Sequence, residues 1–281
     1  MAFTLDNCTM LLSSYDGGED LWEGFFTSVK HQWKDFHMPV VLNTESKSYT
    51  HEGFDIKTFQ FYKPGQKVPW GKRLIRTLKA IKTDYILLIL DDFWLEDAVD
   101  TEFLEKCLQW MKENPDVAVL SFKPVAGFGP NIRDNRFERF EKRPQKARYR
   151  FNCQVAIWRR KKLIKYLRPH ESPWDWEMAG SIRSSRYKES FYTLIKGEKE
   201  VVPYDMGWVV FRGKWTRRAA VPLAEKYNLN IDFSKRGFYE DYEKEQAAAE
   251  PEQPAPETLF EKVKALWKVL KRKYHTFKSL I

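Results

Sequence analysis

The stretch YILLILDD, residues 85–92, constrains the fold of this chain more than any other segment. Its six uninterrupted apolar residues are too few to span a bilayer, which takes about 20 residues, and are typical of a strand buried on both faces. Asp91 and Asp92 follow at once. In parallel α/β sheets, ligands bind beyond the carboxyl ends of the strands. Two interpretations stay open: acids that form a turn and cap the next helix, or carboxylates that bind a divalent cation and, through it, the phosphates of a nucleotide.

Segments with strand-like and helix-like patterns alternate on both sides of this stretch. Leu21, Phe25, Val29 and Trp33, for example, recur every four residues, which predicts a helix. The same reasoning predicts helices over residues 21–33, 72–81 and 101–112 and strands over residues 9–13, 39–42, 59–62, 85–90 and 117–122. Because strands that alternate with helices form layered sheets, we expect an α/β domain with a mainly parallel central sheet and flanking helices.

The chain has 281 residues, which suits one large domain with an appendage. Residues 246–257, QAAAEPEQPAPE, have almost nothing to bury and predict a solvated linker. We therefore expect one domain over residues 1–245 and a separate unit over residues 258–281. The first residues lack the pattern of a signal peptide, and the three cysteines fit neither a zinc nor a disulfide pattern. Both observations favour a cytoplasmic protein.

The net charge of +9 indicates an anionic partner: nucleic acid, nucleotide phosphates or acidic lipid. Residues 258–281 alone carry a net charge of +6, and apolar residues recur there at spacings of 4, 3, 4 and 7 from Leu259 to Phe277. This pattern predicts a basic amphipathic helix suited to an anionic membrane surface, which would place the chain at the inner face of the cell membrane. The alternative is a helix that packs on its own domain or forms an oligomer contact.

A second group of acids lies in ESPWDWE, residues 171–177, where Trp174 and Trp176 flank Asp175 and precede Glu177. An apolar wall of indole rings would raise the pKa of a carboxyl and suit it to act as a general base. The other interpretation is a helix amino terminus, enriched in acids, over an aromatic patch of the core.

Two further clusters suit a nucleotide. In FRGKW, residues 211–215, a glycine separates Arg212 from Lys214, so that the backbone could approach a diphosphate closely and the cations could bind it. The alternative is an exposed basic loop. After the first predicted strand, Tyr15 could stack on a base and Asp16 could accept a hydrogen bond from it.

Together these segments resemble bacterial glycosyltransferases of the GT-A fold, near glycosyltransferase family 2, and more narrowly the enzymes that assemble surface polysaccharides. The resemblance covers about residues 9–233 and rests on residues 70–93 and 151–167, on SPWDWE, on FRGKW and on the first strand with Tyr15 and Asp16. It implies a GT-A, Rossmann-like sheet and the transfer of a hexosyl group from a nucleotide diphosphate sugar to an acceptor hydroxyl, with inversion. The implied acceptor is a saccharide or a lipid-linked saccharide.

The resemblance also implies a role for each candidate residue. Asp91 and Asp92 would take the place of the family's Asp-x-Asp motif and bind the donor through Mg²⁺ or Mn²⁺. Glu177, or less favourably Asp175, would be the catalytic base. The nucleobase and phosphate contacts would come from Tyr15, Asp16, Arg73, Arg212 and Lys214.

This chain departs from the family pattern because its two aspartates are adjacent. Neighbouring side chains of an extended strand point to opposite faces, so both carboxylates can bind one metal only if the chain turns at Asp91. Two other functions fit the sequence less well. A nucleotidyltransferase is disfavoured because no Gly-rich, Lys-bearing loop follows the first strand. A nucleic-acid-binding protein is disfavoured because no such motif occurs and much of the charge lies in residues 258–281, so no nucleic acid partner is expected.

Overall fold

The computed structural model describes residues 5–125, 130–204 and 208–239. The predicted linker, residues 246–257, and the predicted basic helix, residues 258–281, lie outside the described residues, so both stay predictions. Among the helices described, none combines the length and the apolar character that crossing a membrane requires.

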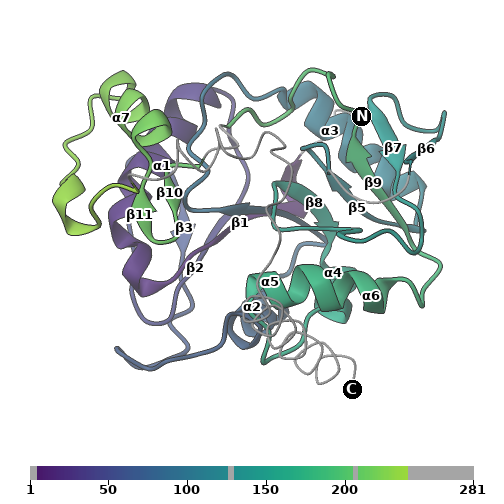
Figure 1. The fold of residues 1–281 in the computed structure, drawn as a ribbon, viewed down its shortest axis with the longest axis horizontal. Coiled ribbons are helices and arrows are strands. Elements are labelled where there is room, and N and C mark those ends of the chain that lie inside the picture. The colour runs from purple at the N-terminus through teal and green to yellow at the C-terminus, as the bar shows by residue number, and fades with distance from the viewer. Residues whose placement is uncertain (1–4, 126–129, 205–207, 240–281) are drawn as a thin grey trace, which may run out of the picture.

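A single mixed sheet organises the described residues (Figure 1). Its nine strands lie in the order β3-β2-β1-β4-β8-β5-β9-β7-β6, and β7 and β8 run opposite to the others. The strand bounds are β1 (Cys8–Ser13), β2 (Val40–Asn43), β3 (Ile56–Lys57), β4 (Tyr85–Leu90), β5 (Val117–Ser121), β6 (Ile132–Arg133), β7 (Phe140–Lys142), β8 (Ala156–Arg159) and β9 (Ser190–Leu194). The predicted α/β fold with a mainly parallel central sheet is confirmed.

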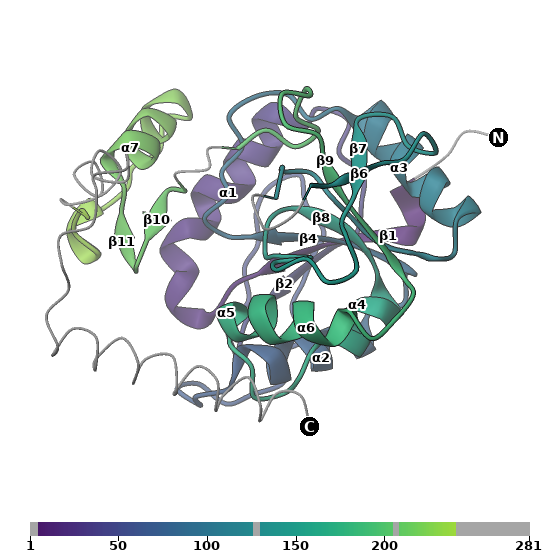
Figure 2. The same cartoon turned by 45° about the vertical axis from the view of Figure 1, so that its right-hand side comes forward.

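Helices cover both faces of this sheet (Figure 2). One layer holds α1, α3 and α7, and the other holds α2, α4 and the helical stretch from α5 to α6. The bounds are α1 (Glu19–Gln32), α2 (Trp70–Ala80), α3 (Thr101–Glu113), α4 (Arg160–Tyr166), α5 (Pro173–Asp175), the π-helical segment η3 (Trp176–Gly180), α6 (Ser181–Ser184) and α7 (Arg217–Lys226). Shorter elements are the 3₁₀ turns η1 (Leu5–Asn7), η2 (Asp16–Gly18) and η4 (Phe233–Lys235) and a separate hairpin, β10 (Val210–Phe211) with β11 (Lys214–Trp215).

Strand β4 lies inside the sheet, between β1 and β8, and is buried on both faces, as its unbroken apolar sequence predicts. Tyr85, Leu87 and Ile89 pack into the core beneath α1 and α3. Ile86 and Leu88 pack into the core beneath α2 and α4. Because successive side chains of a strand point to opposite faces, one sequence run contributes to both cores and holds the end of β4 rigidly.

The predicted helices and strands are confirmed to within about two residues, except for the strand predicted over residues 59–62. Gln60 has a φ of 47°, which is incompatible with an extended strand. The turn at Gln60 lets the rings of Phe59 and Phe61 stack at 5.3 Å, and the Arg76 guanidinium lies 4.3 Å from the Phe61 ring centroid. The alternating apolar residues there therefore form an aromatic cluster rather than a strand. The edge strand β3 lies earlier in the chain.

Candidate functional site

The chain turns immediately after β4. The Phe93 N–H donates to the carbonyl oxygen of Leu90 at 3.3 Å, which closes a turn containing both aspartates. The turn that joint metal binding requires is therefore present. The Asp91 carboxylate accepts a hydrogen bond from the Ser14 hydroxyl at the end of β1, so that the carboxyl ends of two neighbouring parallel strands meet at one place.

The loop after β1 packs closely against the Asp91 carboxylate and the Ser14 hydroxyl. A Cβ at Gly18 would lie 2.5 Å from Oδ2 of Asp91 and 2.9 Å from Oγ of Ser14, closer than real atoms approach. Trp22, on α1, donates from Nε1 to Oγ of Ser14 at 2.7 Å. Glycine is therefore needed at this position for the loop to pack against the carboxylate.

The two carboxylates lie in surroundings that disfavour their charge. Burial raises the pKa of Asp91 to about 6, against the opposing hydrogen bond from Ser14. Burial, and then the neighbouring charge of Asp91, raise the pKa of Asp92 well above its usual range. In addition, Oδ1 of Asp92 is inaccessible to solvent and has no hydrogen-bond partner in the described residues. A buried carboxylate oxygen without a donor is costly unless a cation or ligand completes it.

The pair fits a magnesium or manganese ion held jointly with substrate phosphates. Within the described ranges, no three His, Cys, Asp or Glu side chains gather into a metal-binding cluster. Mg²⁺ needs no such cage, because it is usually bound by one or two carboxylates together with phosphates and waters. The unpartnered oxygen of Asp92 is the structural feature that such an ion would satisfy.

The two residues predicted to contact the nucleobase lie on the loop after β1, but their side chains are not equally available to a ligand. Tyr15 is exposed, as a stacking residue must be. The Asp16 carboxylate instead accepts from the backbone N–H groups of Glu45, Ser46 and Lys47 at 3.0, 3.0 and 3.1 Å. Partial burial acts in the opposite direction, yet hydrogen bonds from Ser46 and then Lys47 hold the pKa of Asp16 below its usual range. In this structure Asp16 therefore fastens the loop after β2 to the loop after β1.

Arg73, predicted to neutralise phosphates, is buried beneath the same two loops. Its guanidinium pairs with Glu45 and donates to the carbonyl oxygen of Ser14 at 2.6 Å. Burial lowers the pKa of Arg73 to about 10, and the nearby charges of Asp16 and Asp91 oppose that shift. Arg73 thus brings a positive charge close to Asp91 while it holds the loops in place.

The predicted cations Arg212 and Lys214 are both exposed, at and beside the tip of the β10–β11 hairpin. Arg212 and Gly213 have φ values of 50° and 80°, which give the two-residue turn that a tight hairpin requires. Arg212 donates to the hydroxyl of Tyr239 at 2.7 Å.

Arg236 joins this hairpin to the loop after β1, and the sequence analysis missed it. Its guanidinium binds Asp20 at 2.5 Å, donates to the carbonyl oxygen of Gly17 at 2.9 Å and reaches that of Gly213 at 3.5 Å. Its charge also favours the ionised forms of Asp91 and Asp92. No signal in the sequence near residue 236 distinguishes this arginine from a surface residue.

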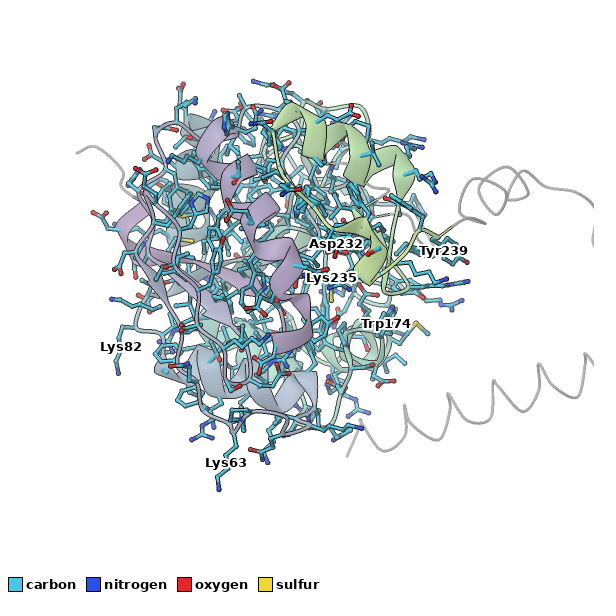
Figure 3. All side chains as sticks on the ribbon, turned by 90° about the vertical axis from the view of Figure 1, so that its left-hand side faces the viewer. Lys63, Lys82, Trp174, Asp232, Lys235 and Tyr239 are labelled. Atoms are coloured by element: carbon cyan, nitrogen blue, oxygen red, sulfur yellow. The ribbon has the colours of Figure 1, made fainter. Side chains whose placement is uncertain are left out.

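The segment predicted to supply a general base forms a continuous helical stretch from α5 to α6. Asp175 is the N3 residue of a capping box: its Oδ2 accepts from the backbone N–H of Ser172 at 3.2 Å, and its own N–H donates to the Ser172 hydroxyl oxygen at 3.2 Å. Trp176 is fully buried in the core, whereas Trp174 is 74% exposed and projects from the surface (Figure 3). The two tryptophans therefore do not form a common wall, and the Asp175 carboxylate is engaged in starting the helix.

Glu177 lies two residues further along the same helical stretch and contacts the residues just before β8. Its Oε1 accepts a hydrogen bond from the Cys153 N–H at 2.8 Å, and burial raises its pKa. Burial raises the pKa of the Cys153 thiol well above its usual value, and the nearby charges of Glu177 and then Asp92 add to that shift. Because β8 runs opposite to β4, its amino end lies at the carboxyl end of β4. Cys153, three residues before β8, therefore lies near both Glu177 and Asp92.

The structure thus brings most of the candidate residues to one edge of the sheet. Glu177 and Asp92 both lie near Cys153, Asp91 adjoins Asp92 in the turn after β4, and Tyr15 lies on the loop after the neighbouring strand β1. Three contributors escaped the sequence analysis: Ser14, Glu45 and Arg236. The strand-end rule could have indicated Ser14 and Glu45, because each follows a parallel strand by one or two residues.

The raised pKa of Asp91 makes a prediction about stability. The folded protein binds a proton at Asp91 more tightly than the unfolded chain, so ionising Asp91 costs stability as pH rises from about 4 to about 6, and the whole cost remains above that. We expect Asp91→Asn to raise the free energy of unfolding at pH 7 by about 2–3 kcal/mol and at pH 4 by less than about 1 kcal/mol. Urea unfolding in EDTA at both pH values measures this, and destabilisation at pH 7 would contradict it.

Comparison with known proteins gives similarity of fold. No family model matches this chain, and no curated protein matches its sequence. Among solved structures, residues 1–349 of TarS from S. aureus are 13% identical over 82% of this chain and 68% of that chain, with a TM-score of 0.45. The mannosyltransferase PcManGT from Pyrobaculum calidifontis, in complex with GDP-Man and Mn²⁺, is 14% identical over 98% and 83%, with a TM-score of 0.46. The Q189E active-site mutant of LgtC is 12% identical over 64% and 70%, with a TM-score of 0.36.

Proposed function

We propose that this chain is a glycosyltransferase that moves a hexosyl group from a nucleotide diphosphate sugar to an acceptor hydroxyl, with inversion. The observation that carries the proposal is that Glu177 and Asp92 both lie close to the buried Cys153. One carboxylate has an unpartnered buried oxygen suited to a cation, and the other has a raised pKa suited to a base. These are the two groups that a single displacement from a diphosphate leaving group needs.

The donor would lie along the carboxyl ends of β1 and β4. Tyr15 is exposed and can stack on the base, while Asp16 holds the loop that presents it. Asp91 and Asp92 would hold Mg²⁺ or Mn²⁺, an ion that supplies charge stabilisation for the departing diphosphate. Arg212 and Lys214, at and beside the tip of the neighbouring hairpin, would approach the phosphates from the open side.

Glu177 would act on the acceptor. Its Oε1 is fixed by the Cys153 N–H, which orients the carboxylate, and its raised pKa increases its affinity for a proton. Glu177 takes the proton of the acceptor hydroxyl as that oxygen attacks C1 of the sugar. The bond from C1 to the diphosphate oxygen breaks, its electron pair leaves with the nucleoside diphosphate, and the configuration at C1 inverts.

Several parts of the proposal rest on sequence alone. They are a bacterial role in surface polysaccharide or glycolipid assembly, a saccharide or lipid-linked saccharide acceptor, and attachment of residues 258–281 to the inner face of the cell membrane. Asp175 stays a second candidate for the base, but its engagement in the capping box makes it the weaker one.

Donor binding provides the direct test. In a thermal-shift panel of nucleotide diphosphates and their sugars, we expect one nucleotide family, at about 100 times its Kd with Mn²⁺, to raise Tm by about 5 °C or more. Asp92→Asn should reduce this shift, since it removes a charge from the proposed metal site. Asp55→Asn, which alters an exposed residue outside the site, is the matched control. No shift with any nucleotide would count against the proposal.

A further inference from the structure

Two long segments of this chain carry many basic residues and no acidic ones. Residues 58–83 contain seven Lys or Arg and no Asp or Glu, and residues 156–170 contain six and none. The net charge of residues 1–245 is only +6, so the rest of that region is net negative. The positive charge of the body is therefore concentrated in these two segments.

The fold places both segments in one layer. They contain α2 and α4, which pack against each other on the same face of the sheet (Figure 2). Arg160, at the start of α4, donates to the carbonyl oxygens of Leu78 and Thr83 at 3.2 and 2.6 Å and so ties α4 to the end of α2. In Figure 3, Lys63 projects from the lower edge of the molecule and Lys82 from its left-hand edge. We call the surface formed by residues 58–83 and 156–170 the α2–α4 face.

Some cations of this layer have structural partners, but those on the outer side of α2 do not pair with acids. Lys162 and Lys165 both bind Glu189, at 2.6 and 2.8 Å. The unpaired set is exposed and makes no ion pair with any acid in the described residues: it comprises Lys63, Lys67, Lys72, Arg76, Lys79 and Lys82. Lys72, Arg76 and Lys79, which line one groove, carry like charges that repel one another unless an anionic partner covers them.

A shallow groove of about 230 Å³ lies on this face. Lys72, Arg76 and Lys79 line it at i, i+4 and i+7 of α2, so that all three point the same way. Its remaining lining is Tyr62, Ile75 and Pro169. Cations beside a tyrosine and aliphatic carbons suit the headgroup level of a bilayer, where apolar and charged groups are both accommodated.

We propose that the α2–α4 face binds an anionic membrane surface through the phosphates of its lipids. A broad face with one shallow groove matches an extended layer of phosphates, because its cations are spread over a loop and a helix. The face also adjoins the candidate site, since Trp70 in the first turn of α2 donates to the Ser13 hydroxyl at 3.0 Å. This proposal does not depend on sugar transfer, and it is separate from the prediction for residues 258–281.

The test compares full-length variants in vesicle sedimentation. We expect Lys72→Glu/Arg76→Glu/Lys79→Glu to lower the partition coefficient on vesicles of phosphatidylglycerol and phosphatidylcholine at least tenfold. The matched control, Lys34→Glu/Lys112→Glu/Lys196→Glu, makes the same charge change at exposed lysines outside this face and should bind like the wild type. If the glutamate variant fails to fold by circular dichroism, the corresponding glutamine variant takes its place, and we expect the same direction of change.

Three outcomes would overturn the proposal. The first is binding of the α2 variant within twofold of the control variant. The second is equal binding of the wild type to vesicles of phosphatidylcholine alone. The third is tighter binding to duplex DNA than to anionic vesicles, with the same loss in the α2 variant, which would make the face a nucleic-acid surface. Loss of nucleotide binding in the Asp92→Asn experiment would leave this result unchanged, so the two proposals fail separately.

Discussion

Glu177→Gln is expected to lower kcat for sugar transfer by a hundredfold to ten-thousandfold, the usual contribution of a general base, while donor affinity stays within about twofold. Glutamine keeps the shape of the side chain, and its carbonyl oxygen can still accept the hydrogen bond from the Cys153 N–H. It cannot take up the proton of the acceptor hydroxyl. Initial rates at saturating acceptor, together with donor binding by calorimetry, measure the two effects separately.

The pH dependence of kcat in the wild type and in Glu177→Gln tests the role of Glu177 more specifically. A base must be ionised to act, and burial raises the pKa of Glu177, so wild-type kcat should fall as pH drops through that raised pKa. The residual rate of Glu177→Gln should lack this acidic limb. Asp175→Asn is the matched control: it weakens the capping box by about 1 kcal/mol and should leave kcat within a few-fold. Full turnover in Glu177→Gln would remove this residue as the base.

Glu171→Ala is expected to lower the free energy of unfolding by about 3–5 kcal/mol, because it leaves a buried charge without its partner. Glu171 is fully buried, and Arg183 is 3% exposed. Arg183 binds both carboxylate oxygens, at 2.6 and 2.8 Å, and the Arg168 N–H donates to one of them at 2.9 Å. Urea unfolding followed by circular dichroism measures the change.

The control for this prediction removes both charges. Glu171→Met/Arg183→Met should recover most of the lost stability, because the pair is then replaced by apolar side chains of similar size. Glu171 directly precedes the helical stretch that carries Glu177, so the single variant should also lower kcat. A loss of less than about 1 kcal/mol in Glu171→Ala would show that Arg183 finds another partner.

The sequence was sufficient to predict the frame of the site. The apolar run lies between Asp84 and Asp91, which mark both ends of the strand, so β4 was predicted to the residue. The rule that ligands lie beyond the carboxyl ends of strands made Asp91 and Asp92 candidate site residues, and that role stays a prediction. Both inferences depend on neighbours in the chain, which the sequence shows directly.

Features that depend on residues far apart in the chain could not be predicted in this way. The choice between Asp175 and Glu177 depends on a capping box and on β8, whose antiparallel position places Cys153 opposite Glu177. Arg236 binds Asp20, although the two residues are 216 positions apart in the sequence. The strand predicted over residues 59–62 was wrong because the left-handed conformation of Gln60 has no signature in the alternating apolar pattern.

Phosphorus NMR of the products tests the central claim most directly. The wild type, incubated with the donor identified by thermal shift, Mn²⁺ and a saccharide acceptor, is expected to release the nucleoside diphosphate, and Glu177→Gln is expected to release it at least a hundredfold more slowly. Release of pyrophosphate from a nucleoside triphosphate and a sugar phosphate would instead identify a nucleotidyltransferase. That result, or equal rates in the two proteins, would contradict the account of Asp92 and Glu177 as the two working carboxylates of a glycosyltransferase.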